Sequence, residues 1–167
     1  MKKLLLLFAL VSMTMTMNAQ EYQTGLGLRL GGINRGITVK HFTGSNTAIE
    51  GILGFARHSL SITALWEKHY PFPTAPGLSW YWGVGGHIGF FQNGYDYGYY
   101  HYNKHDYIYD NDNYDNRFYL GADFIIGLEY KFKDVPISLG LDVKPQIDII
   151  PGLYTYFDGA LSVRFTL

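Results

Sequence analysis

Cysteine is absent from the 167-residue chain, which excludes disulfide bridges, zinc–thiolate sites and a thiol nucleophile. Charged residues are scarce, at 16% of the chain against roughly 25% in typical soluble domains. The 13 lysines and arginines do not outnumber the 14 aspartates and glutamates, so the chain lacks the basic excess that binds a phosphate backbone. We therefore expect no nucleic-acid partner.

Long apolar runs are also missing, and methionine does not occur after position 17. Two lysines precede the longest apolar run, residues 4–11, which gives way to small and polar residues ending at Ala19. This order is typical of a secretory signal peptide, and the run is far shorter than the roughly 20 residues of a membrane-spanning helix. We expect residues 1–19 to be removed and residues 20–167 to form one domain with a net charge of −3.

Glycine and aromatic residues are abundant, with 20 glycines, 15 tyrosines, 11 phenylalanines and 3 tryptophans. Apolar residues recur at every second position, which predicts strands. In residues 118–132, eight alternate positions from Phe118 to Phe132 are apolar without interruption. Soluble strands usually have five or six residues, whereas a tilted membrane crossing needs at least 9 to 11. The pattern predicts eight strands, at about 21–32, 34–42, 47–57, 59–70, 79–92, 118–132, 137–149 and 154–167.

Short connections join most of these segments, so sequence neighbours should pair antiparallel. The expected fold is all-β: an eight-stranded antiparallel up-and-down transmembrane β-barrel. Pro145 lacks a backbone donor within the seventh strand, where we expect a local bulge.

The polar face of the strands mixes charged residues with many glycines, a combination that suits a narrow lumen better than a solvated surface. Opposite charges on this face are nearly balanced, which allows the pairing that buried charges need. The predicted polar network of the lumen consists of Arg29, Lys40, Glu50, Glu67, His87, Asp123, Glu129, Asp142, Lys144, Asp158 and Arg164.

Aromatic residues on the apolar face gather near the strand ends: Trp80 and Trp82 at one end and Phe90 at the other. Such girdles are typical of outer-membrane barrels. Two alternatives stay open: a soluble periplasmic lipocalin-like barrel that binds an apolar ligand, and a barrel enzyme that modifies lipid A. Eight strands enclose a lumen only wide enough for side chains, which argues against an open diffusion pore.

Three segments, 80–91, 127–145 and 159–167, resemble those of small eight-stranded outer-membrane β-barrel proteins of the OmpA-like and OmpX-like type common in Bacteroidetes. The similarity covers essentially the whole chain after residue 19. It implies a location in the bacterial outer membrane, contact with membrane lipid, and insertion by the barrel-assembly machinery. The family implies no catalytic residues. The chain ends at Leu167, whereas the insertion signals of such barrels commonly end in an aromatic residue.

One predicted connection, residues 93–117, is long, carries a net charge of −3 and holds more than half of all tyrosines. Loops of this length are usually functional or disordered, and tyrosine is favoured in recognition loops. We expect it on the cell surface, where it contacts a glycan or a surface protein; a solvated loop without a partner is the alternative. The contact residues would be Tyr95, Tyr97, Tyr99, Tyr100, Tyr102, Tyr107, Tyr109 and Tyr114.

Other motifs are weak. His101 and His105 have the i, i+4 spacing that binds a metal on a helix, but in a loop this spacing has no fixed geometry. Residues 110–116 depart from the pattern of a calcium loop, which leaves only loose divalent binding open there. The glycines of residues 83–89 do not fit a dinucleotide fingerprint. His58 and Ser59 adjoin at a predicted turn without an acidic partner. We assign no catalytic residue, no metal ligand and no cofactor, and we expect no enzyme.

Overall fold

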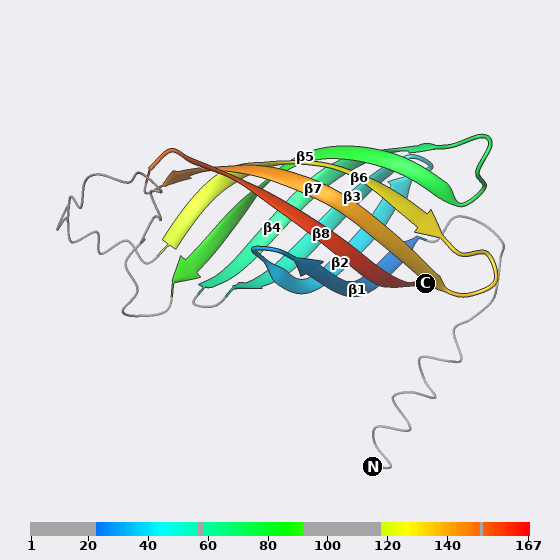
Figure 1. The fold of residues 1–167 in the computed structure, drawn as a ribbon, viewed down its shortest axis with the longest axis horizontal. Helices are drawn as coiled ribbons and strands as arrows, with labels where there is room; N and C mark the ends of the chain where they lie inside the picture. Colours follow the sequence, from blue (N-terminus) through cyan, green and yellow to red (C-terminus); the bar gives the residue numbers. More distant parts are fainter. Residues whose placement is uncertain (1–22, 57–58, 92–117, 151) are drawn as a thin grey trace, which may run out of the picture.

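The computed structural model describes residues 23–56, 59–91, 118–150 and 152–167. Sequence neighbours pair antiparallel, and β1 also pairs with β8, so the sheet closes into a barrel (Figure 1). The prediction of an all-β, closed, antiparallel eight-stranded barrel is thus confirmed. The strands are β1 (Thr24–Gly31), β2 (Arg35–Gly44), β3 (Thr47–Ala56), β4 (Ser59–Pro71), β5 (Leu78–Phe91), β6 (Phe118–Lys131), β7 (Ile137–Ile150) and β8 (Tyr154–Thr166).

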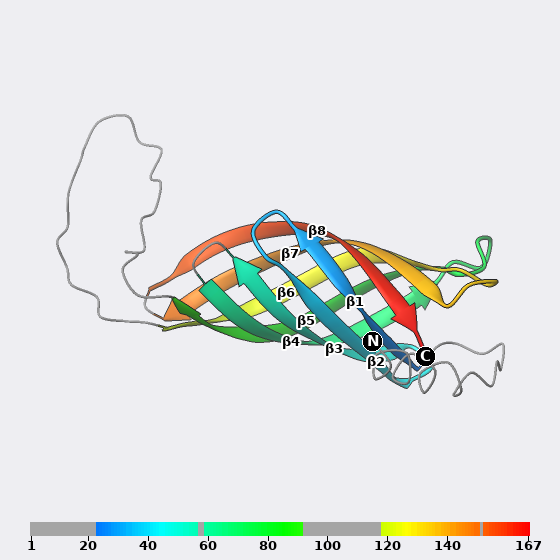
Figure 2. The same ribbon diagram turned by 90° about the horizontal axis from the view of Figure 1, so that it is seen from below.

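The barrel has two ends, which we call upper and lower. β1, β3, β5 and β7 end at the upper end, on the left in Figure 1, and β2, β4, β6 and β8 end at the lower end, where the C-terminus lies. The strands run obliquely along the barrel, as Figure 2 shows from below. Within the described ranges, no helix is long and apolar enough to cross a membrane.

The alternation in the sequence becomes an inner and an outer face. Along β6, the side chains of Phe124 and Ile126 are exposed on the outside, whereas those of Asp123 and Ile125, which alternate with them, are buried inside. Successive side chains of a strand point to opposite faces, so this alternation follows directly from the strand geometry. The same pattern places Glu50 and Ile52 together on the inner face of β3.

The prediction of a β-bulge at Pro145 is wrong. The register between β6 and β7 is the same on both sides of Pro145, and the ladder is only interrupted there. The register shift lies instead between Leu120 and Gly121, near the upper end. The β7–β8 ladder is continuous through Pro145, which indicates that the missing donor faces β6 alone. The hydrogen bond that Pro145 cannot donate is therefore lost without a β-bulge, that is, without an extra residue in β7.

Glycine on the inner face lets neighbouring backbones approach closely. A β-carbon on Gly85 would lie 1.9 Å from the backbone oxygen of Ala64 in the adjacent strand. This oxygen belongs to the ladder and cannot move as a flexible side chain could. By contrast, a β-carbon on Gly51, which points outward, would have no heavy atom within 4 Å.

We therefore predict that Gly85→Ala destabilises the refolded barrel by more than about 2 kcal/mol, because the added methyl group overlaps the β4 backbone. Gly51→Ala is the matched control and should change stability by less than about 0.5 kcal/mol. Urea unfolding in detergent micelles measures both variants. Equal effects of the two substitutions would contradict the close approach of β4 and β5.

Candidate functional site in the barrel lumen

The structure places all eleven residues of the predicted polar network inside the barrel, each no more than 6% exposed. Every strand contributes at least one of them. Because buried charges are costly unless paired, the question is which charges meet across the lumen. Their inward position follows from the strand geometry, whereas a functional role for them stays a prediction.

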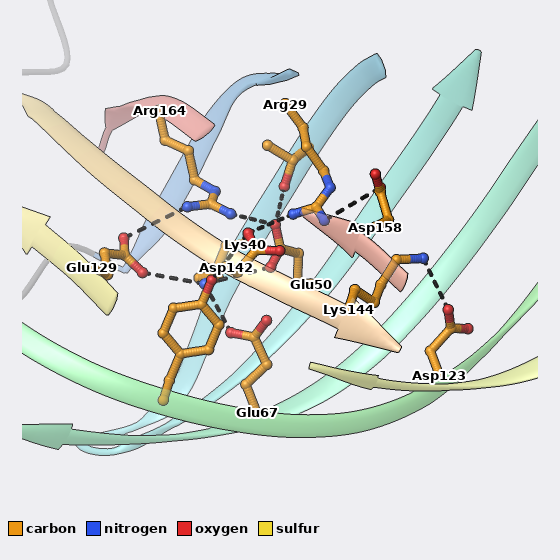
Figure 3. A network of polar contacts seen from close by, with 12 residues as sticks. Arg29, Lys40, Glu50, Glu67, Asp123, Glu129, Asp142, Lys144, Asp158 and Arg164 are labelled. Carbon is orange, nitrogen blue, oxygen red and sulfur yellow. Dashed lines mark hydrogen bonds and ion pairs between the residues drawn. The ribbon is translucent and has the colours of Figure 1, made fainter. Parts of the chain in front are cut away.

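Lys40 occupies the centre of a cluster near the lower end (Figure 3). Its Nζ lies 2.8 Å from Glu67, 3.2 Å from Glu129 and 3.4 Å from Glu50. The three carboxylates come from β4, β6 and β3, so a single ammonium group connects four strands. The Lys40 side chain also lies 4.1 Å from the centre of the Tyr81 ring, a cation–π contact.

Arg164 adds a second cation to this cluster. Its guanidinium bonds Glu50 at 2.5 Å and lies 3.9 Å from Glu129. Glu50 also accepts a hydrogen bond from the Thr38 hydroxyl. Glu50 is therefore shared by two cations and one hydroxyl, which compensates its complete burial.

A second cluster surrounds Arg29. Its Nη1 donates to Asp142 at 2.6 Å, and its Nη2 lies 3.7 Å from Asp158 (Figure 3). The hydroxyl of Tyr81 donates to the same Asp142 oxygen at 3.4 Å. Tyr81 thus contacts both this cluster and Lys40, so the two clusters are joined through one aromatic ring.

A third cluster lies towards the upper end and is built on His87. The two ring nitrogens each lie 2.8 Å from a carboxylate, Asp123 on one side and Asp148 on the other. Lys144 donates to Asp123 at 2.9 Å and to Gln146 at 3.0 Å. Five polar side chains from β5, β6 and β7 are thereby held together.

The predicted set omitted several residues that take part in these clusters, among them His69, Tyr81 and Asp148. His69 bonds Glu67 at 3.0 Å and stacks on Tyr81, with ring centroids 4.8 Å apart. The signal was available, because each residue lies an even number of positions from a predicted lumen residue of its own strand, such as Glu67 or His87. Tyr81 was harder to assign to the lumen, because an aromatic ring is not expected among charged side chains.

The lumen also contains apolar side chains. Ile52, Leu65, Tyr81 and Ile125 form a buried cluster from four successive strands. A water-filled channel would leave its lining accessible, yet these side chains and the charged ones are all nearly or completely buried. Among the described residues, packed side chains and ion pairs therefore occupy the lumen.

The polarity of the outer face is opposite to that of the inner face. Large apolar side chains are exposed on all eight strands, and they include Leu28, Val39, Ile49, Ile62, Val84, Phe124, Leu141 and Val163. Monomeric soluble proteins rarely expose a contiguous apolar surface of this extent.

Aromatic residues on this outer face cluster near the lower end. Tyr70 stacks on Trp80 with ring centroids 4.5 Å apart, and Trp66 meets Trp82 edge to face at 5.9 Å. At the upper end, Phe90 pairs across strands with Phe118. The aromatic residues at the two ends thus bracket the aliphatic surface between them.

A comparison with solved structures identifies a protein domain with a similar barrel fold. The N-terminal β-barrel domain of OprF from Pseudomonas aeruginosa superposes with a TM-score of 0.62 at 14% identity, over 89% of this chain and 100% of that one. The two chains share their fold. No protein-family model and no curated protein sequence matches the chain. The expected OmpA-like architecture is thus supported as a fold, whereas a Bacteroidetes origin stays a prediction.

Several predicted features lie outside the described residues: the signal peptide, the tyrosine-rich connection with its eight contact residues, His58, His101, His105 and residues 110–116. Ser59 begins β4. Within the described part of the chain, no three histidine, aspartate or glutamate side chains are placed to hold a metal ion.

Lys40 provides the sharpest test of the lumen network. We predict that Lys40→Met costs about 3–5 kcal/mol of unfolding free energy, because it leaves three buried carboxylates without their shared cation. Lys68→Met is the control, since Lys68 is only part-buried and its Nζ contacts the Thr47 hydroxyl at 3.4 Å. It should cost less than about 0.5 kcal/mol. Chemical denaturation of both variants in micelles decides, and a stable Lys40→Met barrel would contradict the network.

Proposed function

We propose that the protein is an integral β-barrel of the bacterial outer membrane, of structural or surface-interaction type and not an enzyme. Residues 1–19 would direct its export. The observation that carries the proposal is the inversion of polarity: the charged side chains are buried in the lumen and the large apolar side chains face outward. Membrane barrels need this arrangement because lipid cannot hydrogen-bond or solvate charge.

The height of the apolar surface supports the same reading. Trp80 and Phe90 lie ten residues apart on the outer face of β5. This separation corresponds to roughly 33 Å along a strand, or about 25 Å along the axis of a barrel whose strands tilt by about 40°. The apolar band of outer-membrane barrels is about 25 Å tall. The aromatic residues at both ends would then lie at the two membrane interfaces.

The lipocalin-like alternative is disfavoured by the same inversion. A soluble barrel that holds an apolar ligand needs an apolar lumen and a polar exterior. Here the lumen contains seven buried carboxylates and four buried lysines and arginines. A ligand would have to displace ion pairs such as Arg29–Asp142, which are already made at short distance.

The packed lumen also favours a structural role for the barrel over a role as a diffusion pore. Ion pairs cross the lumen between strands that are not neighbours, such as Lys40 on β2 and Glu129 on β6. A solute would have to break these pairs to pass. The barrel would therefore act as a rigid membrane-embedded support for whatever its ends display.

Membrane insertion is tested by charging the outer face. We predict that Val84→Arg, in the middle of the apolar surface, lowers stability in bilayers by about 2–4 kcal/mol and reduces recovery in the outer-membrane fraction. Val135→Arg is a close control, because Val135 lies between strands at the lower end and is exposed to 45%, against 46% for Val84. Equal tolerance of both substitutions, or recovery of the wild-type protein from the soluble periplasm, would refute the proposal.

Partner binding rests on the composition of residues 93–117. Tyrosine provides large amphipathic contacts at low entropic cost, so this segment is our proposed contact with a glycan or a surface protein. Removing residues 95–115 should abolish binding to the cell surface or glycan array that the wild type binds, while heat-dependent migration on gels still reports a folded barrel. Unchanged binding by this deletion variant would eliminate the contact role.

A further inference from the structure

The barrel wall is lower at β1 than at β7 and β8. β1 has eight residues, whereas β7 has 14 and β8 has 13. At the upper end, the last pair between β1 and β8 joins Gly31 to Ala160. β8 begins at Tyr154, so residues 154–159 extend beyond the end of β1. Both ribbon views show the β1–β2 turn ending short of the upper end of β8 (Figure 1, Figure 2).

The hydrogen bonds of β8 show which of its backbone groups face β1. The carbonyl of Gly159 accepts a hydrogen bond from the N–H of Gly32 at 3.1 Å. At the other end of the strand, Leu167 and Thr24 exchange two backbone hydrogen bonds, at 2.7 and 3.3 Å. In an antiparallel pair, the backbone groups of alternate residues point to the same side. The odd-numbered residues of β8 therefore face β1.

Thr155 and Phe157 continue this row beyond the end of β1. Each directs one backbone N–H and one carbonyl to the open side. Within the ranges that the structure describes, no residue forms a backbone hydrogen bond to these groups. Phe157 lies opposite Pro145 of β7, which has no N–H, and this agrees with the orientation of Phe157 away from β7. The upper part of β8 is therefore an open sheet edge.

Large apolar side chains accompany the open edge. Leu153 and Phe157 are exposed to 79% and 68%, the two largest fractions among the large apolar side chains that the structure describes. Phe165 lies on the same face of β8, where β1 does pair, and is exposed to only 37%. The end of β1 therefore leaves both backbone groups and apolar surface uncovered.

Lipid cannot complete such an edge. Six residues correspond to roughly 20 Å along a strand, or about 15 Å along the axis of a barrel whose strands tilt by about 40°. Because Phe157 belongs to the apolar outer face, the proposed membrane location would bring its backbone against acyl chains, which offer neither donors nor acceptors. Unpaired sheet edges are also the sites at which a further strand can be added.

We propose that residues 154–158 of β8 are a docking edge for an extended segment of a partner protein, which adds a strand to the sheet above β1. An extended peptide presents backbone donors and acceptors with the same two-residue period as Thr155 and Phe157. The edge also has the length of an average strand, about five or six residues. Apolar side chains at alternate positions of the partner segment would cover Phe157. The need to cover this edge rests on the proposed membrane location.

A second copy of this chain fits the edge poorly. Two copies in one membrane keep their upper ends on the same side, so a rotation about the membrane normal relates them. Because each strand tilts by about 40°, two facing β8 strands would cross at about 80° and would not lie side by side. The edge therefore favours a segment that is free to align with β8.

Nitrogen-15 NMR of the wild-type protein in detergent micelles tests the edge. The amide protons of Thr155 and Phe157 should exchange with water at least about tenfold faster than those of Leu161 and Val163, which pair with β1. The probe is a synthetic peptide of alternating threonine and valine, about seven residues long. Its addition should shift the amide signals of Thr155 and Phe157 and slow their exchange. Equal exchange of the two pairs without peptide, or no effect of millimolar peptide, would overturn the proposal.

A pair of substitutions at Thr155 tests docking through the backbone. Thr155→Pro removes one donor on the open side and leaves the bonds between β7 and β8 in place. Thr155→Val is the matched control, because it keeps the N–H and changes only the side chain. Heat-dependent migration on gels reports whether both barrels fold. Thr155→Pro should weaken peptide binding at least about tenfold relative to Thr155→Val, and equal binding by the two folded variants would refute the docking edge.

A photoreactive phenylalanine analogue at position 157 tests the partner in intact cells. It should crosslink to a protein of one defined mass, and the Thr155→Pro substitution should remove this adduct. The same analogue at position 165, where β1 covers the edge, should give no such adduct. An adduct with the mass of two copies of this chain, or adducts with lipid alone, would overturn the proposal.

The micelle experiments separate the docking edge from the proposed membrane function. Failure of the peptide to bind would remove the docking edge and leave the membrane location standing. Recovery of the wild-type protein from the soluble periplasm would refute the membrane location, whatever the peptide does in micelles.

Discussion

The pairing of buried charges inside the lumen is the constraint on which the rest of the structure depends. A fully buried ammonium or carboxylate is costly unless opposite charges and hydrogen bonds surround it. Lys40 satisfies this condition with carboxylates from three other strands, and Arg29 and Lys144 repeat the solution at other heights. Three of these contacts, Lys40–Glu67, Lys40–Glu129 and Arg29–Asp142, join strands that are not neighbours in the sheet, so they specify how the closed sheet packs as well as compensating charge.

Consequences follow for both faces of the sheet. Polar side chains fill a narrow lumen only where the wall beside them is small, and Gly31 beside Asp158 and Gly121 beside His87 supply such places. Once the charges are inside, the alternation of the strands turns the apolar residues outward. The low proportion of charged residues in the sequence thus has a structural reason: one face needs none, and the other can hold only those that it can pair.

The sequence predicted strands and faces well because the period of two is a direct property of extended backbone. It could not predict which charges meet. Alternation assigns Lys40 and Glu129 to the inner face, but their contact depends on the register accumulated over four strand pairs around the barrel. The wrong bulge at Pro145 has a similar origin, because the effect of a missing donor depends on which neighbour it faces. Asp148 was recognisable as inward-facing, whereas its shared contact with His87 required the three-dimensional structure.

The proposed membrane location requires the outer face to lie in lipid. The three tryptophans allow this to be measured without mutagenesis. Trp66, Trp80 and Trp82 all lie on that face, within or at the border of the apolar surface. Fluorescence of the protein refolded into vesicles should be strongly quenched by bromine atoms placed along the lipid acyl chains and only weakly by a water-soluble quencher. Strong quenching from the aqueous phase, with no effect of the brominated lipids, would contradict a membrane-embedded barrel.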